Sequence, residues 1–461
     1  MDNSTGIQKN KAKRSIFYFF GSFVVALVLT FILKEPTFTD SQVYALFLLF
    51  FAVSLWITEA IPPFAVSLFI FAYLVFTFGN PHLNSAPVKI DQYVNTFSSR
   101  VIWLLLGGFF MAAAMRKTGL DTKLLSLTLK VSGTKPRNIL IALMFTTMVA
   151  GMIMSDSAAT SMVVAAISPL LVSLGKSGVN KALLLGVAIA AAVGGMGTIL
   201  TSTNATAAGL VEETGQRINF LDWMLFGVPI SLTLTAISCY VLIRKYIRNS
   251  PPVSLDFLKP VSLQPAEETK GQRLIVLIVM IVTILFWVTN SIHGITAAAI
   301  SAIPIVALTV TGVLTSNDIK TLPWDTLFLV AGGLSLGEAL QSTGVLDQYA
   351  MYLKTINAPP IIILLILAYL AMIAANVMSG VASCMLLIPL GMAILPGYKT
   401  EVGISVGLSV SATVFLPVSI PSNLIVYSTG YLDQKDFRLG GSIVGLLGPL
   451  LAVLMTLLIR H

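Results

Sequence analysis

The chain has 461 residues, of which 56% are hydrophobic and only 10% charged, and its formal net charge is +8. A soluble domain carries about 25% charged residues because its surface faces water, so this composition excludes a soluble fold. At about 20 apolar residues for each crossing plus a connection, the length accommodates roughly eleven to thirteen membrane-spanning helices. The 28 Lys and Arg gather at the edges of apolar runs. They are typical of topology signals, and no nucleic-acid partner is expected.

Apolar runs recur along the chain and predict an all-α integral membrane protein. The first run, 15–33, follows a basic segment that includes Lys9 and Arg14. It is longer than a signal-peptide core, so we expect a retained first helix with a cytoplasmic N-terminus. The later runs cover 41–58, 62–79, 97–115, 138–174, 181–211, 220–243, 272–291, 294–314, 325–341, 359–396, 402–428 and 441–459.

Several runs do not fit a simple span. Those at 138–174 and 359–396 are too long for one crossing and have polar residues near their middle, which predicts broken helices. A basic cluster follows the run at 97–115, so we expect that run to dip into the membrane and return as a re-entrant hairpin. The proline-rich stretch 244–273 predicts a cytoplasmic linker between two halves.

Short motifs recur in the same order across this linker, at an offset of about 220 residues, and predict an internal duplication. The matched pairs are Gly107-Gly108 with Gly332-Gly333, Thr118-Gly119 with Thr343-Gly344, Asp121 with Asp347, Met154-Ser155 with Met378-Ser379, and Asn204 with Asn423.

A broken helix within a bilayer marks a cavity, because its unpaired N–H and C=O groups need protein or water around them. The N–H groups of a restarting helix favour anions, and hydroxyl and amide groups bind a small polar solute without a buried charge. Asp156 stands out, since a carboxylate at membrane depth costs at least about 2.5 to 3.5 kcal/mol. The predicted substrate-binding residues are Ser155, Asp156, Ser157, Asn204, Ser379, Gly380, Val381, Pro421, Ser422 and Asn423.

Other classes of function fit the sequence less well. An intramembrane hydrolase would need a base beside its serine, and the three histidines are scattered, so we expect no enzyme and no organic cofactor. A cation/proton antiporter could use Asp156 as its ion-binding carboxylate. A passive anion channel would share the helix-dipole arrangement but would show no saturable counterflow.

One segment has a recognisable signature. The run Leu55-Trp56-Ile57-Thr58-Glu59-Ala60-Ile61-Pro62 resembles the Trp-x-Thr-Glu-Ala-Ile-Pro motif of the divalent anion/sodium symporter family, which includes dicarboxylate, citrate and sulfate carriers. The Gly-Gly segments, the turn Gly194–Thr198 and the segment Leu416–Asn423 are similar to that family as well. The likeness extends from residue 41 to the end.

The resemblance implies an inverted-topology repeat of about eleven spans and two re-entrant hairpins, in a homodimer of the inner (cytoplasmic) membrane. It also implies an elevator mechanism, in which a transport domain moves against a scaffold. On this basis the domains are scaffold helices 1–90, a first transport half 91–218, scaffold helices 219–323, a second transport half 324–436 and a C-terminal helix 437–461. Sodium, the possible coupling ion, would bind Ser155, Asp156, Gly197, Thr198, Ser379 and Ser419.

The family's Ser-Asn-Thr motifs are altered in this chain. The first reads Ser155-Asp156-Ser157 and the second Ser379-Gly380-Val381. Gly380 and Val381 remove side-chain oxygens from the second cation site, so we expect that site to be weakened. Importing a dianion against 100 mV costs about 4.6 kcal/mol, which requires accompanying cations. We therefore expect a carrier of small anions, dicarboxylates before sulfate or another oxyanion. It would be coupled to Na+ or H+ at Asp156, or would exchange anions without a cation.

Overall fold

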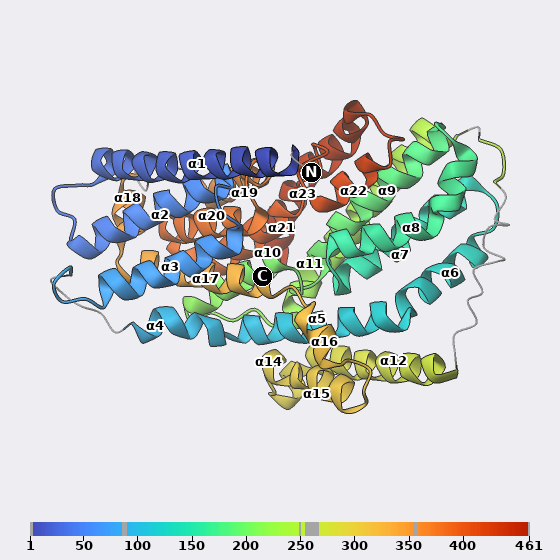
Figure 1. The fold of residues 1–461 in the computed structure, drawn as a ribbon, viewed down its shortest axis with the longest axis horizontal. Coiled ribbons are helices and arrows are strands. Elements are labelled where there is room, and N and C mark those ends of the chain that lie inside the picture. Colours follow the sequence, from blue (N-terminus) through green and yellow to red (C-terminus); the bar gives the residue numbers. More distant parts are fainter. Residues whose placement is uncertain (1–2, 85–89, 249, 254–266, 354–357, 460–461) are drawn as a thin grey trace.

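The computed structural model describes residues 3–84, 90–248, 250–253, 267–353 and 358–459, and every regular element in these ranges is a helix. Within them, nine helices are long and apolar enough to cross a membrane, or ten if one sharply bent pair counts as a span. Figure 1 shows long helices lying side by side. The predicted all-α membrane fold is confirmed.

The signature motif forms the turn between the second and third helices. These are α2 (Asp40–Thr58) and α3 (Pro63–Phe78), and both follow the long α1 (Asn3–Leu33). Glu59 ends α2 in the left-handed region at φ 48°, which a non-glycine residue rarely adopts. Pro63 then starts α3, where its missing N–H costs no hydrogen bond. The motif thus has a structural role of its own.

The prediction of a hairpin at 97–115 is wrong. After the short α4 (Asp91–Val94) and η1 (Asn95–Ser98), α5 (Arg100–Thr118) runs uninterrupted for 19 residues. It is about 28 Å long, enough for one crossing. As the fourth crossing after α1, α2 and α3, it returns the chain to the side on which α1 begins. A full crossing therefore already places the basic cluster beside the N-terminus.

The Gly-Gly pairs allow close helix packing. A Cβ on Gly107 would lie 2.6 Å from Ser301 Cβ, and one on Gly332 would lie 2.3 Å from Ser67 Cβ. Gly107 brings α5 against the start of α15 (Ala302–Val310), and Gly332 brings α17 (Trp324–Ser342) against α3. Glycine is needed here for space.

Two pairs of helices form the hairpins instead. Helices α7 (Pro136–Ile153) and α8 (Asp156–Leu174) pack against each other and both pack against α9 (Gly178–Gly194), so the chain reverses at Ser155. Helices α19 (Pro360–Ala375) and α20 (Gly380–Ile394) repeat the arrangement around Ser379. The predicted interruptions of these two runs are confirmed.

Each hairpin is followed by a broken helix. In the first half, α9 gives way to η2 (Gly195–Gly197) and a four-residue turn, 198–201, before α10 (Ser202–Glu213) begins. In the second half, α21 (Lys399–Val410) and α22 (Pro421–Ser428) are separated by ten residues outside any helix.

The remaining helices connect and cover these units. Residues 249 and 254–266 of the predicted linker 244–273 lie outside the described residues. The elements are α6 (Leu120–Ser132), α11 (Phe220–Leu242), η3 (Ile243–Ile247), α12 (Glu267–Val288), α13 (Asn290–His293), α14 (Ala297–Ile300), α16 (Ser316–Lys320), α18 (Val345–Leu353), η5 (Pro396–Tyr398), η6 (Gln434–Asp436) and α23 (Phe437–Ile459).

Two ion pairs show that the repeats are inverted. Lys117 at the end of α5 lies 2.6 Å from Asp318 in α16, six residues before α17 begins. The end of α5 and the start of the equivalent helix α17 therefore share one face. Lys181 at the start of α9 lies 2.7 Å from Asp436, shortly after α22. The start of one broken helix and the end of the other therefore also lie on the same face of the molecule.

Candidate functional site

The two hairpin tips have the same backbone geometry. Ser155 has φ −61° and ψ 149°, and Ser379 has φ −65° and ψ 148°. Each serine Oγ caps the following helix, accepting from the N–H of Ala158 at 3.3 Å or of Ala382 at 3.2 Å. The tips thus present two helix N-termini in equivalent conformations.

An asparagine holds each helix break together. Asn204 Nδ2 donates to the carbonyl oxygens of Gly195 at 2.8 Å and Thr198 at 2.7 Å. Asn423 Nδ2 donates to Val414 at 3.2 Å and Leu416 at 2.8 Å. Both amide groups are thus committed to the backbone, and a ligand could meet only their carbonyl oxygens. Asn204 Oδ1 is buried and accepts no hydrogen bond from the described residues.

A hydroxyl ties each break to the hairpin of its own repeat. Thr198 Oγ1 donates to the Met152 carbonyl at 2.6 Å, three residues before Ser155. Ser419 Oγ donates to Asn376 Oδ1 at 2.7 Å, three residues before Ser379. Sequence reasoning missed Asn376, although a lone amide at the end of the apolar α19 marks it.

Each tip also meets the break of the other repeat. Asp156 at the start of α8 lies beside Ser422 at the start of α22, and α8 packs on α22. A Cβ on Gly380 would lie 2.7 Å from Thr203 Cγ2, and Cys384 Sγ lies 3.8 Å from the Thr203 carbonyl oxygen. The two hairpins and the two breaks therefore form a closed ring of contacts.

The predicted residues divide into a reachable layer and a buried one. Ser155 and Pro421 are exposed, and Asp156, Ser157, Ser379, Gly380 and Ser419 are partly exposed. The buried members are Gly197, Thr198, Asn204, Val381, Ser422 and Asn423. The tips can therefore be reached by a solute, while the breaks support them from behind.

Asp156 is the charged side chain at these tips. Its Oδ1 accepts from the Ser157 N–H at 2.8 Å, and Ser157 Oγ lies 3.2 Å from Ser155 Oγ. In the described part of the chain, no three His, Cys, Asp or Glu side chains are grouped to hold a metal ion. A cation here would be held by one carboxylate with hydroxyl and carbonyl oxygens, which suits Na+ or a proton.

Comparison with known proteins identifies relatives of this arrangement. The family model described as "Citrate transporter" matches residues 53–415. A sodium-dependent dicarboxylate transporter of Staphylococcus saprophyticus is 26% identical over 471 residues, covering 93% of this chain and 88% of that protein.

Two fungal relatives are longer. An uncharacterized transporter of Schizosaccharomyces pombe and an inorganic phosphate transporter of Saccharomyces cerevisiae are each 29% identical over 73% of this chain. This chain spans only 39% and 37% of their lengths, respectively.

Solved structures agree with the fold. The YdaH transporter of Alcanivorax borkumensis superposes with a TM-score of 0.59 at 13% identity, covering 86% of this chain and 98% of that one. MtrF of Neisseria gonorrhoeae gives 0.56 at 11% identity, covering 88% and 96%. At these identities the likeness concerns the fold alone.

Proposed function

Because the chain belongs to the citrate transporter family, we propose that it is a secondary carrier of small dianions, with C4-dicarboxylates as its first substrates. The dicarboxylate-transporter name of the staphylococcal relative supports this choice. The observation that carries the proposal is the ring formed by the two tips and the two breaks. It brings the N-termini of α8 and α22, and those of α10 and α20, into contact. Helix N-termini in a site of limited polarity favour anions.

In this proposal Asp156 carries the coupling cation. An ionised carboxylate beside Ser422 would repel a dianion, so Na+ or a proton must neutralise it before the substrate binds. Ser155, Gly197 and Thr198 supply the other oxygens of a sodium site. The equivalent site at Ser379 and Ser419 is weaker because Gly380 and Val381 lack side-chain oxygens.

We propose an elevator movement between two groups of helices. The moving group contains α7–α11 and α19–α23, which include both hairpins and both broken helices. The fixed group contains α1–α6 and α12–α18. Helix α5 belongs to the fixed group because it packs against α12, α14 and α15 (Figure 1), and α17 belongs to it because it packs along α3. The boundaries in this proposal differ from the expected 91–218 and 324–436.

A cytoplasmic N-terminus in the inner membrane suits this arrangement. It puts the basic ends of α5 and α11 and the ion pair between Lys117 and Asp318 on the cytoplasmic side. Arg100 and Glu212 then lie on the external side. The two groups of helices are expected to operate within a homodimer.

Transport by the purified protein in liposomes tests the proposal. Labelled succinate should enter against its gradient when a sodium or proton gradient is imposed, and unlabelled dicarboxylates should compete. Uptake that needs internal dicarboxylate and no cation gradient would indicate anion exchange. The name of the yeast relative makes phosphate one alternative substrate, and sulfate is the alternative expected from the sequence. Competition by these anions alone would replace the dicarboxylate assignment. Cation efflux driven by protons, with no anion flux, would indicate the antiporter.

A further inference from the structure

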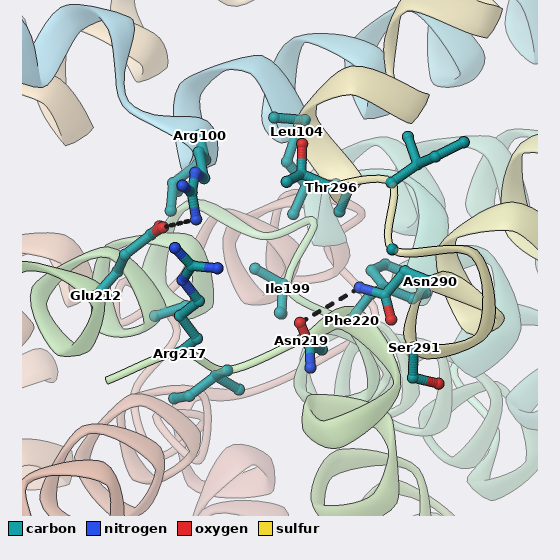
Figure 2. Close-up of a pocket in the computed structure, with 17 residues that line it drawn as sticks. Arg100, Leu104, Ile199, Glu212, Arg217, Asn219, Phe220, Asn290, Ser291 and Thr296 are labelled. Atoms are coloured by element: carbon teal, nitrogen blue, oxygen red, sulfur yellow. Dashed lines mark hydrogen bonds and ion pairs between the residues drawn. The ribbon is translucent and has the colours of Figure 1, made fainter. Parts of the chain in front are cut away.

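A cavity with polar side chains in its wall lies away from the hairpin tips. It has a volume of about 260 Å³ and lies where α5, the segment joining α10 to α11, and the segment joining α12 to α14 meet (Figure 2). Ile199, next to Thr198 of the first break, forms part of its wall. The cavity thus lies between the two proposed groups of helices, on the face that carries Arg100 and Glu212.

The charges in this cavity favour an anion. Arg100 Nη1 lies 2.9 Å from Glu212 Oε1, so the charges of these two side chains neutralise each other. Arg217 also lines the cavity and forms no hydrogen bond or ion pair with any described residue. Figure 2 shows its guanidinium group beside the Arg100–Glu212 pair. Two guanidinium groups facing one carboxylate leave a net positive site, and their planar geometry suits a carboxylate.

An unsatisfied acceptor lies in the same cavity. Asn290 is 9% exposed, and its Nδ2 donates to Asn219 Oδ1 at 3.3 Å. Its Oδ1 is buried and accepts no hydrogen bond in the described part of the chain. Buried polar atoms normally find a partner, so this oxygen calls for a donor. A carboxylate alone has no donor to offer, whereas a hydroxyl group on the bound molecule does.

We propose that this cavity binds a small hydroxycarboxylate anion, distinct from the anion at the hairpin tips. Arg217 holds the carboxylate, Arg100 shares it with Glu212, and Asn290 Oδ1 accepts from the hydroxyl. The ion pair between Arg100 and Glu212 joins the two groups of helices. The bound anion competes with Glu212 for the Arg100 guanidinium group. The choice of a carboxylate rests on the proposed transport function.

Binding of labelled L-malate and succinate to the purified full-length protein in nanodiscs tests this inference. Two components are expected for malate, one of which disappears in the double variant Ser155→Ala/Ser379→Ala. Arg217→Gln should weaken the other component about tenfold or more, the loss expected for a hydrogen bond to a charged group. Arg217→Lys should retain most of it. Lys34→Gln, an exposed charge outside the cavity, is the matched control and should change neither component.

Three results would overturn the inference. One is a single binding component that is lost with the tip serines. Another is a second component that persists unchanged in Arg217→Gln. The third is an Arg217-dependent component that binds succinate as tightly as malate, which would remove the role of Asn290. If malate binds through Arg217 but liposomes show no transport, the cavity assignment stands and the proposed function fails.

Discussion

Arg100 of α5 and Glu212 of α10 form an ion pair of 2.9 Å across the boundary between the two proposed groups of helices. Two other sets of ion pairs in the described residues join distant parts of the chain. Lys117 pairs with Asp318 inside the fixed group, and Lys181 pairs with Asp433 and Asp436 inside the moving group. An elevator movement must therefore break the first pair and can leave the others intact.

The first prediction concerns this pair. Arg100→Gln and Glu212→Gln should each change the initial rate of succinate uptake by the same factor, about two- to fivefold, because an exposed pair is worth at most about 1 kcal/mol. The double variant should show no further change. Additive effects in this double-mutant cycle would show that the pair is not coupled to transport.

Asp156→Asn should abolish the dependence of uptake on the coupling cation. The amide keeps the size of the side chain, but it carries no negative charge to bind Na+ and does not take up and release a proton. Uptake in proteoliposomes with and without imposed sodium and proton gradients measures this. Ser157→Ala, which alters the next side chain and leaves the carboxylate, is the control. Unchanged cation dependence in Asp156→Asn would remove Asp156 from coupling.

The asparagines at the breaks should contribute stability. Asn204→Ala and Asn423→Ala each remove two hydrogen bonds to buried carbonyls, so each should lower the free energy of unfolding by about 2 to 4 kcal/mol. Thermal unfolding in detergent would show a lower Tm. Asn317→Ala, whose side chain accepts only from Lys320 near the surface, should leave Tm unchanged. A Tm equal to wild type in both break variants would contradict the role assigned to them.

The contact between Lys117 and Asp318 predicts a dependence of stability on pH. The Lys117 ammonium group lowers the pKa of Asp318 from 3.8 to about 2, so the folded state favours the charged carboxylate. This contribution is present above pH 4 and is lost as the pH falls toward 2. The Tm difference between wild type and Asp318→Asn should therefore shrink across that window. A constant difference would contradict the electrostatic origin.

Close packing at the Gly-Gly pairs predicts a steric effect. Gly332→Ala would put a methyl group 2.3 Å from Ser67 Cβ and 2.6 Å from its Cα, and should destabilise the protein by about 1 to 3 kcal/mol. Gly21→Ala in α1 meets no neighbouring atom within 4 Å and is the matched control. Equal Tm values for the two variants would indicate that α17 can move away from α3.

The sequence predicted features that depend on local chemistry. Polar residues inside overlong apolar runs located the breaks before Ser155 and Ser379, and the matched motifs predicted the duplication. The breaks follow from the cost of unpaired backbone groups in a bilayer, and the duplication follows from the repeated order of the motifs. The hairpin at 97–115 was predicted wrongly because three crossings precede this run, and a fourth full crossing already brings the basic cluster to the side of the N-terminus.

Side-chain partners and the packing of distant segments could not be predicted from the sequence. Asn204 was expected to face the substrate, and its residue type could not show that its amide donates to Gly195 and Thr198. The cavity at Arg217 is made by three segments that are far apart along the chain. Only their packing brings the arginines and Asn290 together.

The matched dihedral angles of Ser155 and Ser379 give the two tips one shape, while the residue that follows is a carboxylic acid at the first tip and glycine at the second. A guest molecule with identical ends would therefore find its halves in unlike surroundings. An unsymmetrical acid bound between the tips should therefore prefer one of its two end-to-end orientations.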